Sequence, residues 1–362
     1  MNMYRYSLFI PENTAPENVK KIGVYNSNSK RISSIPIGNL ALPSLGEKLY
    51  SFGALSDVHT FSDIAYTEDT TANDDFVQAL TYLQDKVDFT CICGDLTCFG
   101  TISDWINYKN LVAAYAGNMP VYAIAGNHEY WYAEKGETVN VANVISTYTG
   151  HPLRYTIEQG NDVYIFVGAA SSNDIFTSSS HLQWLYEQLE TNRNKRCFLF
   201  IHSFIKGEQY CGDATELYTN GDMYTDYTMQ NKYRRTVLVS LLKHYKNVIF
   251  FHGHSHELLN TQEYTEKLTV PLPANYDNTL GSHSVHIPSL AIPIDITSGS
   301  RVRVYGKSEG YVVDVYENHI VLRGRDFVKG EYIPIAQYCI DTTLQTIAPN
   351  TYTDTTGTIT TQ

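Results

Sequence analysis

Five short apolar segments of this chain each run into an Asp, Asn or His side chain, and this recurrence constrains the fold more than any other feature. The segments are residues 49–55, 89–93, 121–125, 197–201 and 248–251. The polar residues that follow them are, in chain order, Asp57, Asp95, Asn127, His202 and His254. Each segment has the length and composition of a buried strand. Because ligands gather at the carboxyl ends of strands in open α/β sheets, we expect the five loops to converge on one site.

Helical periods separate the first three strands. Phe76, Leu80, Leu83 and Val87 recur at spacings of four, three and four residues, as on one face of a helix. A second amphipathic segment follows Ser103, a candidate N-cap. Strands therefore alternate with helices, and this order predicts an α/β chain.

Two hairpins are predicted outside that alternation. Residues 153–158 and 163–167 are joined through a Gly-Asn turn. Residues 22–25 and 32–37 flank a short polar loop near the start of the sequence.

Composition and patterning along the chain predict four regions. They are an N-terminal β extension (residues 1–48), the main domain (49–300), a small antiparallel β unit that completes the core (301–345) and a polar flexible tail (346–362). Apolar residues alternate in the third region, as in half-buried strands. The fourth region is rich in Thr and has too little apolar surface to fold on its own.

Charge and hydropathy argue against two classes of partner. Lys and Arg total 26 against 38 Asp and Glu, a formal net charge of -12, so extended nucleic acid would be repelled. No apolar run approaches the roughly 18 residues of a membrane span, so we expect no membrane insertion. The first residues lack the apolar core of a secretory signal. The expected location is the cytoplasm, with attachment to a virion or a cell surface as the alternative.

Each polar motif taken alone has an ordinary structural explanation. Asp57 and His59 could form a surface pair, since side chains two residues apart on a strand share a side. Asp95 after Gly94 could cap a helix. A lone His202 after an apolar strand is more often a core histidine with a hydrogen-bond partner. The set of motifs is therefore more informative than any member.

In this order, the motifs resemble the calcineurin-like metallophosphoesterase superfamily. The family's pattern is D-x-H, G-D-x-x-x-x-G, G-N-H-(D/E), a later H, and G-H-x-H. The residues that fill it here are Asp57, His59, Gly94, Asp95, Gly100, Gly126, Asn127, His128, Glu129, His202, Gly253, His254 and His256. The resemblance spans about residues 54 to 256, and every position of the pattern is filled.

The resemblance implies a fold and a set of metal ligands. The fold is an α/β sandwich of two mixed β-sheets flanked by helices, with small β appendages at both ends. The implied ligands are Asp57, His59 and His256 for one ion, Asn127, His202 and His254 for the other, and Asp95 as the bridge between them.

The resemblance also implies a chemistry. His128 has the place of the family's outer-sphere histidine, which contacts the substrate phosphate and is often assigned as the general acid. Glu129 is expected to orient its neighbours. Two ions about 4 Å apart, of Mn, Zn, Fe or a mixture, can hold a shared hydroxide and stabilise charge on the attacking and leaving oxygens. The expected reaction is hydrolysis of a small phosphodiester or phosphomonoester.

The residues after Asp95 bear on the branch of the family. Leu96 to Gly100 lack the Asp-Arg that follows this motif in the family's Ser/Thr protein phosphatases. Gly-Asp-Leu-Thr more resembles the branch that contains cyclic-nucleotide phosphodiesterases and purple-acid-phosphatase-like enzymes.

Other interpretations stay open at this point. A binding or structural component, such as a cell-surface or phage-particle protein, could keep the fold without activity, although degenerate members usually lose ligands. A nuclease would need a basic groove, and the sequence does not indicate one. Residues 203–232, rich in Tyr and acidic residues, either select the substrate or form a surface loop packed by its own tyrosines. His283 and His286 are interpreted as structural.

Overall fold

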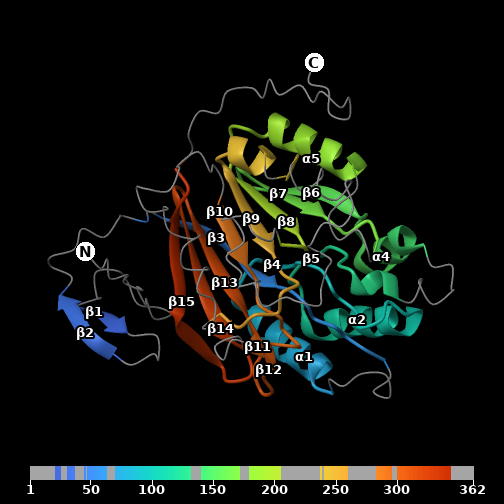
Figure 1. Cartoon of the computed structure of the whole chain (residues 1–362), viewed down its shortest axis with the longest axis horizontal. Helices are drawn as coiled ribbons and strands as arrows, with labels where there is room; N and C mark the ends of the chain where they lie inside the picture. Colours follow the sequence, from blue (N-terminus) through green and yellow to red (C-terminus); the bar gives the residue numbers. More distant parts are fainter. Residues whose placement is uncertain are drawn as a thin grey trace.

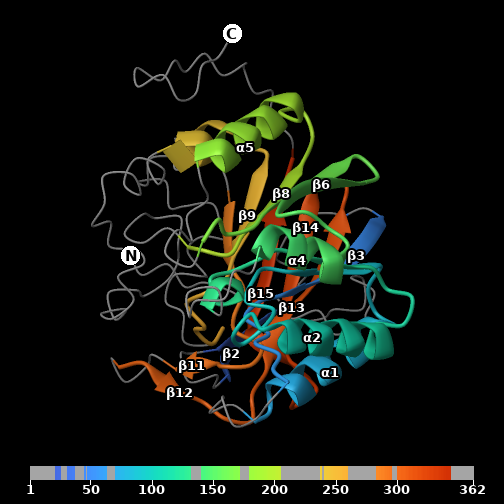
Figure 2. The ribbon, with the colours of Figure 1, turned by 90° about the vertical axis from the view of Figure 1, so that its right-hand side faces the viewer.

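Two large mixed β-sheets form the centre of the computed structural model, with helices over their outer faces (Figures 1 and 2). The structure describes residues 21–25, 31–36, 45, 47–62, 70–131, 140–171, 179–204, 237–238, 240–259, 283–295 and 300–343. The arrangement confirms the α/β sandwich of two mixed sheets that was expected from the sequence.

The first sheet combines strands from distant parts of the chain. Its order is β15 (Glu331–Asp341), β14 (His319–Asp326), β13 (Glu309–Tyr316), β3 (Lys48–Leu55), β4 (Phe89–Ile92) and β5 (Val121–Ala123). β3, β4 and β5 run parallel to one another, whereas β13, β14 and β15 are antiparallel to their neighbours. The antiparallel strands expected after residue 300 therefore join the large sheet through the pairing of β13 with β3.

The second sheet lies across the core from the first. Its order is β10 (His283–His286), β9 (Val248–His252), β8 (Cys197–Ile201), β7 (Asp162–Val167) and β6 (Arg154–Gln159). β6 and β7 form the hairpin that was predicted there, and the other pairs are parallel. β8 and β9 therefore end on the same edge.

Aromatic rings fill the space between the two sheets. Phe52 of β3 lies 5.3 Å from Tyr164, 5.4 Å from Phe198 and 5.9 Å from Phe251, measured between ring centroids. All four side chains are fully buried. Burial of one such ring contributes about 1.5 to 3 kcal/mol to folding. Strands buried on both faces need continuous apolar sequence, which explains the apolar runs.

Helices cover the outer face of each sheet. α1 (Ala72–Leu83), α2 (Ile102–Tyr115) and α4 (Val141–Thr149) share a core with the first sheet. α5 (Ser179–Thr191) and the helical residues 237–238 and 240–244 share a core with the second. Figure 2 shows α5 on one side of the strands and α1 with α2 on the other.

Two details of the helices differ from expectation. Thr101, rather than Ser103, caps α2: its Oγ1 accepts a hydrogen bond from the Asp104 backbone N–H at 3.0 Å. The interpretation of Ser103 is wrong because Thr101 has the extended backbone of an N-cap, with φ -68° and ψ 153°. Val87, expected on the first helix, lies beyond the end of α1 but contacts the same core.

Two short antiparallel pairs complete the described strands. β1 (Lys21–Tyr25) pairs with β2 (Arg31–Pro36), which confirms the predicted N-terminal hairpin, and β11 (Ile294–Asp295) pairs with β12 (Val302–Arg303). The boundaries of the four regions stay predictions. Within the part of the chain that the structure describes, no helix has the length and hydropathy needed to cross a membrane.

Candidate metal centre

The loops after β3, β4, β8 and β9 bring six candidate ligands into one buried cluster. The cluster contains two groups of side chains whose ligand atoms all lie within 4.8 Å of one another. One group is Asp57, His59, Asp95 and His256, and the other is Asp57, Asp95, His202 and His254. The expected convergence of strand ends is therefore observed, across two sheets rather than one.

In the first group, His256 lies closest to a carboxylate. Its Nε2 is 3.0 Å from Asp57 Oδ1 and 3.3 Å from His59 Nε2. His59 Nε2 is 3.9 Å from Asp95 Oδ2. These four atoms surround a space of the size that a metal ion occupies.

In the second group, His202 lies close to two other candidate ligands. Its Nε2 is 3.2 Å from Asp95 Oδ2 and 3.1 Å from His254 Nδ1. The seventh candidate, Asn127, follows β5 and is buried with 1% exposure. Asp95 and Asp57 are common to both groups, whereas the resemblance assigned only Asp95 as a bridge.

Hydrogen bonds outside the cluster orient the ligands. His202 Nδ1 donates to the Cys93 carbonyl oxygen at 2.6 Å, and His256 Nδ1 donates to the Ile292 carbonyl oxygen at 3.1 Å. Each bond leaves the Nε2 lone pair facing the cluster, as in protein metal sites. Asp57 Oδ2 accepts from the His254 backbone N–H at 2.9 Å, so its Oδ1 faces inward.

The donor set fits a pair of metal cations. Asn127 Oδ1 is buried and forms no hydrogen bond to any described residue, and the buried oxygens Asp57 Oδ1 and Asp95 Oδ2 face imidazole nitrogens, the nearest on His256 and His202. A buried polar atom without a partner is costly, and a cation would satisfy all three. Oxygen and imidazole nitrogen together suit Mn, Fe and Zn.

The backbone of the ligand loops is unusual. Asp57, His59, Asp95, His254 and His256 all have positive φ, between 48° and 68°. Such angles are uncommon outside glycine, although Asp and His adopt them more readily than most residues, and they cost free energy and persist only where the surroundings impose them. The clustering of five such residues in the ligand loops is consistent with a backbone that is held in place around the candidate site.

Two motif glycines are required by close approach. A Cβ on Gly94 would lie 2.5 Å from His202 Nδ1, and a Cβ on Gly126 would overlap Asp95 Oδ1. Each glycine therefore admits a candidate ligand from another loop. This explains why Gly precedes Asp95 and Asn127 in the sequence.

The charges of the cluster compensate one another. Burial raises the pKa of Asp57, but His256 and His202 outweigh burial and hold that pKa well below its usual range. Burial lowers the pKa of His202, but Asp95 and Asp57 raise it to about 10. Two buried carboxylates thus need nearby positive charge, which a protonated His202 or a metal cation provides. Burial lowers the pKa values of His59 and His254, which leaves them neutral, as metal ligation requires.

Glu129 ties two of the ligand loops together. Its Oε1 accepts from the Thr97 backbone N–H at 2.9 Å and its Oε2 from the Gly126 backbone N–H at 2.6 Å. Burial, with a smaller effect from Asp95, raises the pKa of Glu129 to about 7. These contacts agree with the expectation that Glu129 orients its neighbours.

His128 lies beside the cluster and in neither group of ligands. Its Nδ1 donates to the Cys98 carbonyl oxygen at 2.6 Å, and its Nε2 is 3.9 Å from Asp95 Oδ2. Its backbone N–H donates to Asp95 Oδ1 at 3.0 Å. His128 is therefore close to the cluster without belonging to either ligand group, and its role as an outer-sphere residue stays a prediction.

Sequence reasoning missed a set of contacts behind the His254–His256 loop. His286 Nε2 and Ser255 Oγ are fully buried and share a hydrogen bond of 2.7 Å. Arg301 donates to the Ser255 carbonyl oxygen at 2.5 Å. His286 reaches this place because β10 runs parallel to β9, a pairing of segments distant in sequence. No local motif marks it.

We expect His286→Ala to weaken metal binding by about 10-fold to 100-fold, the range seen when a residue behind a ligand is removed. The loss of the Ser255 contact would loosen the loop that carries two candidate ligands. His283→Ala, on the same strand, is the matched control, and His286→Gln should recover part of the affinity. Calorimetric titration of folded protein with Zn²⁺ measures the effect. Equal affinities in the two alanine variants would contradict it.

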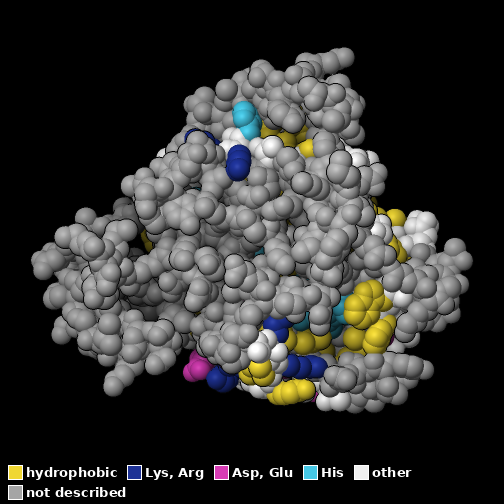
Figure 3. Space-filling model, viewed as in Figure 1, with side chains coloured by type: hydrophobic (Ala, Val, Ile, Leu, Met, Phe, Trp, Pro, Cys, Tyr) yellow, Lys and Arg dark blue, Asp and Glu magenta, His cyan; other side chains and the backbone are white. Residues whose placement is uncertain are grey.

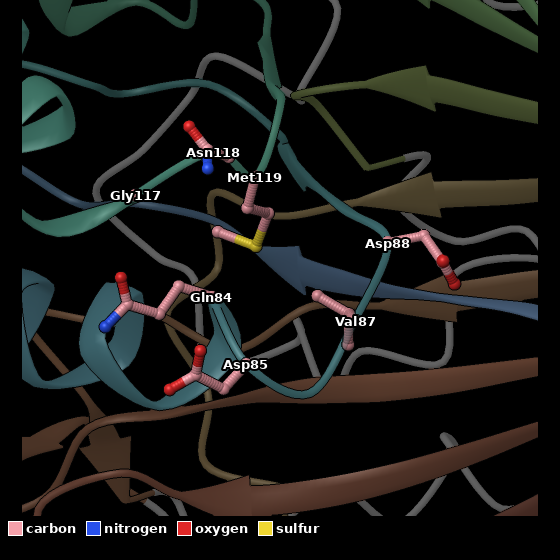
Figure 4. Close-up of a pocket in the computed structure, with 7 residues that line it drawn as sticks. All are labelled: Gln84, Asp85, Val87, Asp88, Gly117, Asn118 and Met119. Carbon is pink, nitrogen blue, oxygen red and sulfur yellow. The ribbon is translucent and has the colours of Figure 1, made fainter.

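A cavity lies away from this centre (Figure 4). It is lined by Gln84, Asp85, Val87, Asp88, Gly117, Asn118 and Met119. Asp88 and Met119 precede β4 and β5, so the cavity is at the opposite ends of these strands from Asp95 and Asn127. Asp88 Oδ2 accepts from the Ser51 backbone N–H at 2.8 Å. The cavity therefore has no part in the metal centre.

The Tyr-rich loop predicted at residues 203–232 falls almost wholly outside the described residues, which stop at Phe204 and resume at Val237. Both interpretations of that loop stay predictions.

Comparison with solved structures finds chains of low sequence identity. A conserved uncharacterized protein from Streptococcus pneumoniae TIGR4, described as a predicted phosphoesterase, is 12% identical, with 81% of this chain and 97% of that chain covered and a TM-score of 0.35. Vacuolar Protein Sorting 29 from Cryptosporidium parvum is 11% identical, with 82% and 100% covered and a TM-score of 0.35. A single mutant of Vps29 from Entamoeba histolytica is 10% identical, with 80% and 98% covered and a TM-score of 0.32.

Comparison of the sequence with protein families identifies a family for this chain. No curated protein matches the sequence significantly. Residues 50–258 match the calcineurin-like phosphoesterase family. The matched segment is more than half of the chain and contains all seven candidate ligands. The chain therefore belongs to the calcineurin-like phosphoesterase family.

Proposed function

We propose that this protein hydrolyses a small phosphodiester or phosphomonoester with the help of two metal ions. The observation that carries the proposal is the overlap of the two ligand groups, which share Asp57 and Asp95. Two ions bound there would supply Lewis acidity and an activated water at neutral pH. Mn, Zn, Fe or a mixture suits the donor set.

The protein's own residues would orient the substrate and move one proton. His128 Nε2 faces the cluster because Nδ1 is held by the Cys98 carbonyl oxygen. In the imidazolium form, with protons on both ring nitrogens, His128 would contact the phosphate through Nε2–H and give that proton to the leaving oxygen, which leaves the neutral ring with its Nδ1–H on Cys98. Glu129 keeps the Asp95 and Asn127 loops in register through its bonds to Thr97 and Gly126.

The substrate class is inferred from the family branch and from charge. The absence of Asp-Arg after Asp95 disfavours a phosphoprotein phosphatase and favours the branch with cyclic-nucleotide phosphodiesterases and purple-acid-phosphatase-like enzymes. A net charge of -12 disfavours a nuclease, since polyanions need a basic groove. The proposed substrate is a small ester, and the proposed location is the cytoplasm. No nucleic-acid or membrane partner is proposed. A purely structural component of a virion or cell surface would not need ligand loops with an unfavourable backbone conformation, so these loops favour an enzyme over such a component.

We expect the protein to bind two metal ions per chain. Chelation should abolish hydrolysis, and Mn²⁺ or Zn²⁺ should restore it, because all seven candidate ligands are present. Elemental analysis gives the stoichiometry, and a panel of diesters, monoesters and nucleotides gives the activity. One ion or none after reconstitution with excess metal would refute the two-metal mechanism. Two ions without hydrolysis of any ester would favour the structural component.

A further inference from the structure

The metal centre opens to the surface beside two histidines. The side chains of His128 and His256 are 14% and 15% exposed, whereas those of Asp57, His59 and His202 are exposed by 1% or less. Among the described side chains of the centre, His128 and His256 are therefore the ones most accessible to a molecule in solvent. What surrounds these two residues decides which substrates fit.

Trp131 stands at this opening, against His128. The two rings lie 3.5 Å apart between centroids, with an interplanar angle of 31°. Trp131 is 37% exposed, and Phe99 lies 6.4 Å away from it, between centroids. Phe99 follows the Asp95 loop and Trp131 follows the Asn127 loop, so each aromatic ring is carried by a candidate ligand loop.

The position of Trp131 is fixed by its neighbours. Its backbone N–H donates to the His128 carbonyl oxygen at the end of a single 3₁₀ turn. Tyr130 beside it donates from its hydroxyl to the Ala169 carbonyl oxygen at 2.7 Å. These bonds hold the backbone that carries the indole beside His128. On the face shown in Figure 3, hydrophobic side chains gather beside histidine atoms in the region of α2.

Packing alone does not account for this placement. Trp is a large side chain whose burial is favourable, yet more than a third of Trp131 faces solvent. Other exposed apolar residues, such as Ile106 and Tyr115, lie on the outer surface of α2. Trp131 differs from them because its ring contacts the candidate general acid.

We infer that Trp131 and Phe99 bind the leaving group of the substrate, and that this leaving group carries a flat aromatic ring. The inference rests on the proposed function: the residue that protonates the leaving oxygen must lie beside the leaving group. Since Trp131 contacts His128, that group meets the indole as well. Stacking on an aromatic side chain is tolerant of the identity of the ring, so the site selects aromatic over aliphatic esters.

Non-hydrolysable phosphonates test the inference without requiring turnover. Benzylphosphonate has the shape of an aryl phosphate ester, and methylphosphonate lacks the ring. Calorimetry on the full chain loaded with Zn²⁺ should show benzylphosphonate binding roughly tenfold more tightly, the effect of one stacked ring. In Trp131→Ala the ratio of the two dissociation constants should fall towards one. Trp131→Phe, which keeps an aromatic face, should retain part of the preference, and Phe99→Ala should reduce it.

Tyr115→Ala is the matched control, because Tyr115 is an aromatic residue of similar exposure, 40%, at the far end of α2. It should leave the ratio unchanged. A wild-type ratio near one, or a full ratio in folded Trp131→Ala, would overturn the inference and leave the proposed function standing. Failure of both phosphonates to bind metal-loaded wild type would overturn the proposed function, and the inference with it.

Discussion

Asp95→Ala is expected to reduce hydrolysis to the level of the metal-free protein. Asp95 is buried, belongs to both ligand groups and has Oδ2 within 3.2 Å of His202 Nε2. Its loss removes a ligand from each proposed ion at once. Metal content should fall with activity, and the thermal stabilisation by added metal should disappear. In the wild type that stabilisation is about 2.7 kcal/mol at a metal concentration a hundred times the dissociation constant.

Asp162→Ala separates loss of a ligand from loss of a buried carboxylate. Asp162 is also buried and pairs with Arg196 at 2.5 Å, but it begins β7, whereas the metal centre follows the other end of the parallel strand β8. Leaving Arg196 unpaired should cost about 3 to 5 kcal/mol of stability. Folded Asp162→Ala should nevertheless bind two metal ions. Full metal content in Asp95→Ala would show that Asp95 is not a bridge.

His128→Ala should lower turnover by roughly a hundredfold or more, the usual contribution of general acid catalysis. Metal content should stay at the wild-type value, because His128 is in neither ligand group and its hydrogen bond to Asp95 comes from the backbone, which alanine retains. Steady-state kinetics with elemental analysis of the same samples tests both parts.

His151→Ala controls for the removal of a histidine elsewhere. His151 stacks on Tyr155, with 4.6 Å between ring centroids, and lies in the loop before β6. Its replacement should leave turnover unchanged. If His128→Ala loses metal, the residue is part of the metal site and its assignment as general acid is wrong. If it keeps full turnover, the proton comes from another group.

The candidate ligands could be found from the sequence because their signals are local. Each lies within a few residues of an apolar strand, and glycines at positions 94 and 126 mark places where loops approach closely. A strand end is a property of consecutive residues. Parallel pairing, which the alternation of strands and helices predicts, accounts for the convergence of the β3, β4 and β5 ends within one sheet and of the β8 and β9 ends within the other. The meeting of the two sets depends on how the two sheets pack.

Features that depend on the pairing of segments distant in sequence could not be predicted from the sequence. His286 contacts Ser255 because β10 pairs with β9, and no sequence pattern near residue 286 predicts that pairing. The sharing of Asp57 by both ligand groups depends on backbone angles that no pattern encodes. The N-cap of α2 was misplaced by two residues because both Thr101 and Ser103 are suitable residue types and only the backbone angles distinguish them.

The pairing of β3 with β13 has a consequence for synthesis of the chain. Lys48 and Asp314, which meet across this pair, are 266 residues apart, and every candidate metal ligand is translated before β13. A nascent chain that ends just after His256 thus contains every candidate ligand, whereas β3 and β9 still lack their partners β13 and β10. At a synthesis rate of about 5 to 20 residues per second, β13 is made several seconds later. An unpaired edge strand can pair with strands of other chains, so this topology creates a risk of aggregation during synthesis. In a chain truncated after residue 258, the edge would stay unpaired and the risk would be permanent.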